Sequence, residues 1–74
     1  MNASQRDPTQ TDRLLFALEA AHGGWVGLPE LVHRTGAYAV HSRAADLRRR
    51  GLPVENRVRF DPLTGRRHSF YRLA

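Results

Sequence analysis

The sequence contains no cysteine, no lysine and no long apolar run. Without cysteine there is no disulfide framework and no thiolate for a zinc site, so the fold must depend on buried apolar side chains. A helix that crosses a bilayer needs about 20 apolar residues, and no run approaches that length. The polar N-terminus also lacks the apolar segment of a signal peptide. We therefore expect one small cytoplasmic domain with no membrane contact.

Signatures of catalysis and of cofactor binding are missing as well. The chain has no glycine-rich phosphate loop, no nucleophile elbow and no pair of acids in a recognisable frame. Metal ligands on a helix need a paired spacing that the scattered histidines do not have. We predict that the chain is not an enzyme and that it binds no cofactor, metal ion or small-molecule ligand. The histidines in question are His22, His33, His41 and His68.

Positive charge is plentiful but unevenly distributed. All 12 basic residues are arginines. Residues 34–74 hold ten arginines against three acids, a net charge of +7, whereas residues 1–33 hold two arginines against four acids, a net charge of −2. A basic half beside a weakly acidic half is typical of a surface that binds a polyanion. The alternative is a solvated surface that only keeps a small protein soluble.

Apolar periodicity predicts three helices in a domain of residues 9–74, preceded by a flexible tail over residues 1–8. The first helix starts at a cap on Thr9 or Thr11 and ends near His22. A short strand follows at residues 25–28, and the second helix runs to the turn at Gly36. The third helix covers residues 37–50. The expected core positions are Leu14, Leu15, Leu18 and Ala21, then Leu28, Leu31 and Val32, then Val40, Ala44 and Leu47.

The apolar period changes to two after residue 52, which predicts strands. Val54, Val58 and Phe60 alternate with charged residues, so we expect a half-buried strand. Residues 61–65 form a turn that contains proline and glycine. Residues 66–73 form the returning strand, with Tyr71 and Leu73 toward the core. We expect Trp25 to pack beside this sheet.

The order helix, strand, helix, helix, strand, turn, strand predicts an α+β fold of the winged helix-turn-helix layout, with three helices and a β-hairpin wing on a small antiparallel sheet. A family resemblance is carried by residues 13–18, 28–36 and 42–55 and by the final Tyr71-Arg72-Leu73. Through these segments, residues 11–74 resemble short winged helix-turn-helix proteins of bacteriophages and prophages and, more loosely, the N-terminal DNA-binding domain of the biotin repressor. The resemblance implies binding of double-stranded DNA in transcription or phage regulation, with the protein on the nucleoid when bound.

The third helix has a face that suits base recognition. At 100° per residue, Arg49 falls at about 180° from Val40, on the opposite side from the apolar stripe. Arginine can fork onto guanine, and a small residue such as Ala45 allows close approach to a thymine methyl group. An ordinary solvent-exposed face is the alternative. Asp46 can pair with Arg49 or Arg50, and Arg43 is expected to be structural. The predicted recognition residues are His41, Ser42, Ala45, Arg48 and Arg49.

The hairpin brings a second group of arginines, Arg57, Arg59, Arg66 and Arg67, around its turn. Such a wing is expected to lie against the DNA backbone or to enter the minor groove, whose negative potential attracts arginine. The alternative is that charged edge strands only discourage aggregation.

Phe16 does not fit the apolar stripe of the first helix, because it falls about 200° from Leu14. It is covered by the N-terminal tail or forms the contact of a homodimer.

Two other functions compete with regulatory DNA binding. One is a protein-interaction adaptor that binds no DNA, and the other is nonspecific architectural or RNA binding.

Overall fold

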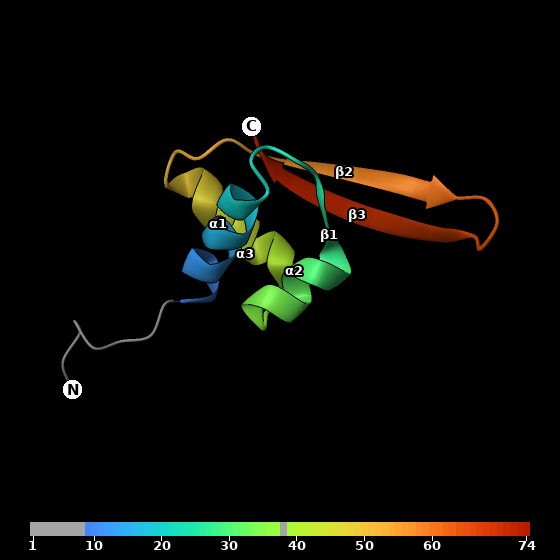
Figure 1. Ribbon diagram of the computed structural model, residues 1–74, viewed down its shortest axis with the longest axis horizontal. Coiled ribbons are helices and arrows are strands. Elements are labelled where there is room, and N and C mark those ends of the chain that lie inside the picture. Colours follow the sequence, from blue (N-terminus) through green and yellow to red (C-terminus); the bar gives the residue numbers. More distant parts are fainter. Residues whose placement is uncertain (1–8, 38) are drawn as a thin grey trace.

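The computed structural model describes residues 9–37 and 39–74, so the expected tail over residues 1–8 lies outside the described residues. The fold is α+β, as predicted, and has the layout of a winged helix: three helices pack together at one end of a three-stranded antiparallel sheet (Figure 1). No helix within the described residues is long and apolar enough to cross a membrane. The elements are α1 (Gln10–Ala20), β1 (Val26–Gly27), α2 (Leu28–Thr35), α3 (Val40–Arg49), β2 (Val54–Asp61) and β3 (Arg66–Leu73).

Helix α1 begins at a capping box, the reciprocal pairing that satisfies two orphan donors of the first turn. The Thr9 hydroxyl accepts from the Asp12 amide at 3.1 Å, and the Asp12 carboxylate accepts from the Thr9 amide at 3.2 Å. Thr9 is therefore the cap, and the alternative cap Thr11 is instead buried at 5 % exposure. The helix ends before His22 and Gly23, which both adopt positive φ.

Glycines end the next two helices. Gly36 closes α2 at φ 69°. Gly51 follows α3 at φ 87°, where its amide donates to Arg48 and the Leu52 amide donates to Leu47. These two bonds form a Schellman motif, which needs a left-handed residue and so favours glycine. Helix α3 begins at Val40, later than the predicted residue 37, because Ala37 is held in the preceding turn by a bond from its amide to the Thr35 hydroxyl.

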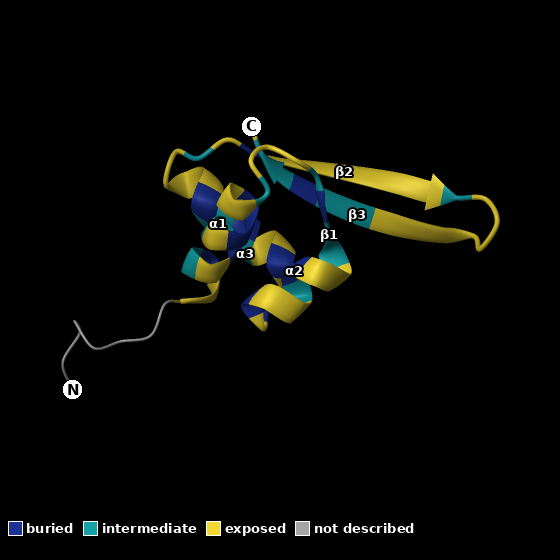
Figure 2. Ribbon diagram, in the orientation of Figure 1, coloured by how far each residue is buried: buried dark blue, intermediate teal, exposed yellow. Residues whose placement is uncertain are grey.

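The core lies between the three helices and the base of the sheet (Figure 2). The predicted stripe of α3 is confirmed, since Val40, Ala44 and Leu47 are at most 1 % exposed. Leu28 and Val32 of α2 are only partly buried, and so are Leu15 and Ala21. The core cluster consists of Leu14, Ala17, Leu18, Val26, Leu31, Val40, Ala44, Leu47, Val54 and Tyr71.

The hairpin of β2 and β3 projects away from the helices (Figures 1 and 2). Strand β3 is central in the order β1-β3-β2, and the β2–β3 register runs from Val54↔Leu73 to Asp61↔Arg66. The prediction that β2 is half-buried is wrong, because Val54 is its only buried residue while Val58 and Phe60 are 54 % and 63 % exposed. The reason is that the helices cover only the base of the hairpin.

Polar contacts tie α1 to α3 at the edge of this core. The Thr11 hydroxyl donates to the Asp46 carboxylate at 3.0 Å, and the Arg50 guanidinium pairs with Asp12 at 3.0 Å. Asp46 also pairs with Arg43 at 3.1 Å and with Arg49. The Thr11 hydrogen bond, and after it the charges of the two arginines, hold the pKa of Asp46 below its usual value. Protonation of Asp46 would therefore remove its ion pairs with the two arginines and weaken the connection between the two helices.

We expect Leu47→Ala to lower the free energy of unfolding by about 2–5 kcal/mol, because it opens a cavity at a fully buried position. Leu63→Ala is the matched control, since Leu63 is 94 % exposed and its truncation should cost about 0.5 kcal/mol or less. Urea unfolding followed by circular dichroism measures both. Equal midpoints for the two variants would show that the core is assigned to the wrong face of α3.

We also expect the stability to depend on Asp46 in acid. A carboxyl group whose pKa is lowered by folding contributes stability above its unfolded pKa, and this contribution is lost as the pH falls through the folded pKa. Asp46→Asn keeps an acceptor for Thr11 but cannot titrate. Its unfolding free energy should therefore fall less steeply than that of the wild type below about pH 4. Identical slopes in urea unfolding at a series of pH values would contradict this role.

Candidate nucleic-acid interface

The solvent-exposed face of α3 holds the predicted recognition residues, but they divide into two groups. Ser42 and Arg49 lie in the open, and the Arg49 side chain is 72 % exposed. Ala45 is half-buried between them and adds little bulk. His41 and Arg48 lie on the flank of the helix and contact the base of the hairpin. The structure therefore leaves Ser42, Ala45 and Arg49 as the free face of α3.

His41 connects α3 to the central strand. Its Nδ1 atom is hydrogen-bonded to the hydroxyl of Tyr71, and the two rings meet edge to face with centroids 5.5 Å apart. Tyr71 is fully buried, and burial raises the pKa of its hydroxyl, so the group stays neutral at ordinary pH. A buried hydroxyl needs a partner, and His41 supplies it. Although His41 is exposed, as a recognition residue must be, one of its ring nitrogens is therefore already engaged.

Arg48 makes a second connection between α3 and the hairpin. Its Nε donates to the backbone carbonyl of Val54 at 2.9 Å, at the first residue of β2. This bond joins the last turn of α3 to the start of β2, and the Schellman turn at Gly51 lies between these two residues in the chain. The two contacts fix the angle between α3 and the hairpin. Neither contact was predicted from the sequence, because His41 and Arg48 were considered there as recognition residues or as ordinary surface residues and not as partners of the hairpin.

The four wing arginines are all exposed, and none has an ion pair among residues 9–37 and 39–74. They do not share one face, however. Cross-strand neighbours lie on the same face of a hairpin, and the register pairs Arg57 with Phe70, Arg59 with His68 and Arg66 with Asp61. Arg67 pairs with Phe60 and therefore lies on the opposite face. Positive charge thus surrounds the hairpin on both sides.

Trp25 packs against the outer face of the sheet, beside it as predicted. The guanidinium groups of Arg72 and Arg57 lie 4.8 Å and 5.4 Å from the centroid of its ring. These cation–π contacts hold Arg57 near the base of the hairpin, while Glu55 accepts a hydrogen bond from Arg72. The sequence gives no local signal for this contact, because residues far apart in the chain meet only once the register of β3 is known.

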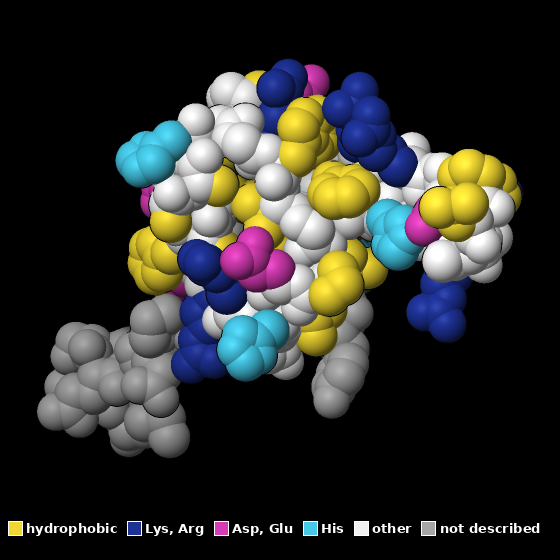
Figure 3. Space-filling model, turned by 45° about the vertical axis from the view of Figure 1, so that its right-hand side comes forward, with side chains coloured by type: hydrophobic (Ala, Val, Ile, Leu, Met, Phe, Trp, Pro, Cys, Tyr) yellow, Lys and Arg dark blue, Asp and Glu magenta, His cyan; other side chains and the backbone are white. Residues whose placement is uncertain are grey.

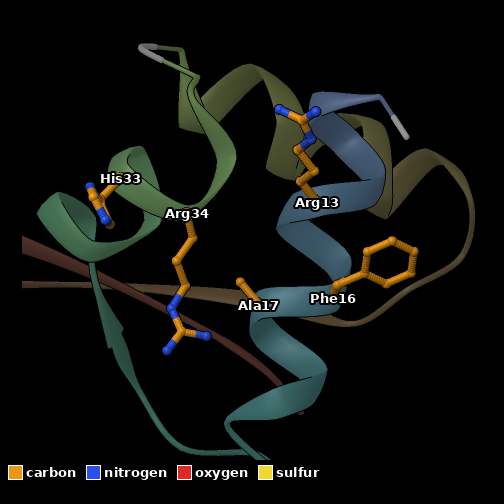
Figure 4. Close-up of a pocket in the computed structure, with 5 residues that line it drawn as sticks. All are labelled: Arg13, Phe16, Ala17, His33 and Arg34. Atoms are coloured by element: carbon orange, nitrogen blue, oxygen red, sulfur yellow. The ribbon is translucent and has the colours of Figure 1, made fainter. Parts of the chain in front are cut away.

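A shallow hollow lies between α1 and α2 (Figure 4). It is lined by Arg13, Phe16, Ala17, His33 and Arg34, and Phe16 is 55 % exposed. Figure 4 shows that these side chains do not converge, since Phe16 and His33 point to opposite sides. The hollow therefore lacks the convergent polar groups of a ligand site. Within the part of the chain that the structure describes, no three His, Asp or Glu side chains gather as metal ligands do.

The basic surface thus comes from two adjoining elements, the free face of α3 and the hairpin that is fastened to its flank. Neither a known protein family nor any curated protein or solved structure matches the chain.

Proposed function

We propose that the chain binds double-stranded DNA as a small regulator of transcription, of the kind found in phages and prophages. The observation that carries the proposal is the projecting hairpin, whose four exposed arginines have no ion partner within the described residues and which is fixed to the flank of α3. In this arrangement α3 enters the major groove, and the wing reaches the backbone and the minor groove beside it. In this role the protein acts in the cytoplasm and associates with the nucleoid.

The free face of α3 has the chemistry that base contacts need. The Ser42 hydroxyl can donate or accept, and Ala45 permits close approach to a methyl group. The Arg49 guanidinium pairs with Asp46 at the surface, and an exposed ion pair of this kind contributes little to stability. Arg49 is therefore free to exchange Asp46 for the edge of a guanine. Asp46 keeps its bond to Thr11 when this happens.

Duplex DNA fits this surface better than RNA does. The major groove of B-form DNA is about 12 Å wide and admits an α-helix. The major groove of A-form RNA is deep and narrow, so α3 would find no base edges to contact there.

A protein-interaction adaptor remains the competing function, and its natural surface is the hollow at Phe16 rather than the wing. The homodimer through Phe16 also stays a prediction, and sedimentation of the wild type and of Phe16→Ala checks it.

The direct test is binding of a labelled duplex across a series of salt concentrations. We expect affinity to fall steeply as salt rises, because each phosphate that an arginine neutralises releases condensed counterions. Sequence preference is obtained in parallel by selection from a randomised duplex pool. Absence of binding at low salt, with the fold intact by circular dichroism, would exclude DNA binding and favour the adaptor.

Substitutions should separate the contributions of α3 and of the wing. Arg49→Ala should weaken binding by about 1–3 kcal/mol and relax the preference at one or two base pairs, because contacts to base edges carry sequence information. The double variant Arg66→Ala with Arg67→Ala should weaken binding to all sequences alike. It should also reduce the salt slope by about 1–2, as the loss of phosphate contacts requires.

Arg13→Ala is the matched control for charge, because Arg13 is exposed on α1 and lines the hollow at Phe16, outside the free face of α3 and the wing. It should change affinity and sequence preference much less than either variant. If the wing variant altered sequence preference while Arg49→Ala did not, the wing would be the reading element and the placement of α3 in the groove would be wrong. DNA binding itself would stand.

A further inference from the structure

The end of the hairpin carries three large apolar side chains in the open. Val58, Phe60 and Leu63 are 54 %, 63 % and 94 % exposed. Figure 3 shows apolar side chains gathered at this projecting end of the molecule, beside charged ones. Isolated apolar residues are common on protein surfaces, but three together at the tip of a projecting element mark a contact surface.

The register shows which way the two strand residues face. Val54 lies on the core face of β2, and side chains two residues apart share a face, so Val58 and Phe60 continue the same row. The helices cover this row only at Val54. Arg67 is the cross-strand neighbour of Phe60 and lies on the same face. An apolar row and an arginine therefore extend together beyond the body.

The conformation of the turn does not require a leucine side chain at position 63. The turn is held through Asp61, whose carboxylate accepts from the Leu63 amide at 2.9 Å and whose carbonyl accepts from the Gly65 amide at 2.8 Å. Any residue at position 63 except proline supplies that amide. The Leu63 side chain is thus available for a contact outside the chain.

We propose that Phe60 and Leu63 act as an apolar wedge that enters the minor groove and bends the duplex. This inference rests on the proposed function. Apolar side chains that insert between base steps from the minor groove unstack them and kink the duplex by about 20–90°. Arg67 beside Phe60, and Arg66 next to it in the chain, hold the phosphates that flank the inserted side chains.

Charge favours DNA over a second copy of the chain as the occupant of this surface. Two hairpins that met through the face of Phe60 would bring Arg67 of one copy against Arg67 of the other, because these two residues are cross-strand neighbours. Asp61 is the only acid between residues 56 and 70, so such a contact would be dominated by repulsion. A duplex supplies the opposite charge at the same place.

The experiment measures the bend directly. Energy transfer between dyes at the two ends of a short duplex reports their separation, and a parallel titration reports affinity. We expect the wild type to shorten the separation. Phe60→Ala and Leu63→Ala should each remove much of the bend while affinity falls by about tenfold or less. Phe16→Ala is the matched control, since it removes an equally exposed phenylalanine on α1 and should leave the bend unchanged.

Other outcomes overturn the wedge in distinguishable ways. A wild type that binds the duplex without bending it would exclude the wedge and leave DNA binding intact. A wild type that does not bind at low salt would exclude the proposed function as well. Bending that survives both Phe60→Ala and Leu63→Ala would also exclude the wedge. Self-association in sedimentation that Phe60→Ala abolishes would assign the surface to a second copy instead.

Discussion

The buried side chain of Tyr71 is the point at which the separate elements of this domain meet. Tyr71 lies on the central strand, opposite Val26 on one side and Asn56 on the other. Its ring fills the core, and its hydroxyl reaches His41 at the start of α3. The apolar ring contributes burial, while the hydroxyl requires a partner and so fixes where α3 sits. The positions of α3 and of the hairpin follow from this one residue.

The domain separates the part that folds from the part that is available for contact. The core occupies the helical body and the base of the sheet, where Val54 and Tyr71 are buried. Beyond that point the hairpin buries little and depends on its main-chain bonds, its turn and the side-chain bond from Asn56 to the Phe70 carbonyl. Residues there can change with small effects on stability. Arg59, Phe60, Arg66 and Arg67 are therefore exposed and available for a partner.

Local signals in the sequence were sufficient for most of the fold. The spacing of Val40, Ala44 and Leu47 located the buried face of α3, and Gly36 and Gly51 marked the ends of two helices. The alternation of apolar and charged residues in β2 predicted the strand but not its burial. Such alternation shows that one face of the strand is apolar, but it does not show that another element covers that face. How far the helices reach along a hairpin is a property of the assembled fold.

Much of the candidate site could be listed from sequence, but its geometry could not. His41 and Tyr71 are 30 residues apart, and Trp25 meets Arg57 and Arg72 only through the sheet. Such long-range pairs have no periodic signature. Alternation also gives no cross-strand partners, whereas the register pairs Arg67 with Phe60. The assignment of roles along α3 changed for the same reason.

The two bonds between α3 and the hairpin, from His41 to Tyr71 and from Arg48 to Val54, give the molecule a property that neither element has alone. Because they join the base of the hairpin to both ends of α3, they set the direction in which the hairpin leaves the helical body. A duplex that contacted both elements would have to offer its two contact points at the spacing that this arrangement sets. Lengthening each strand of the hairpin by two residues would move the tip by about 7 Å, which is about two base-pair steps along the duplex.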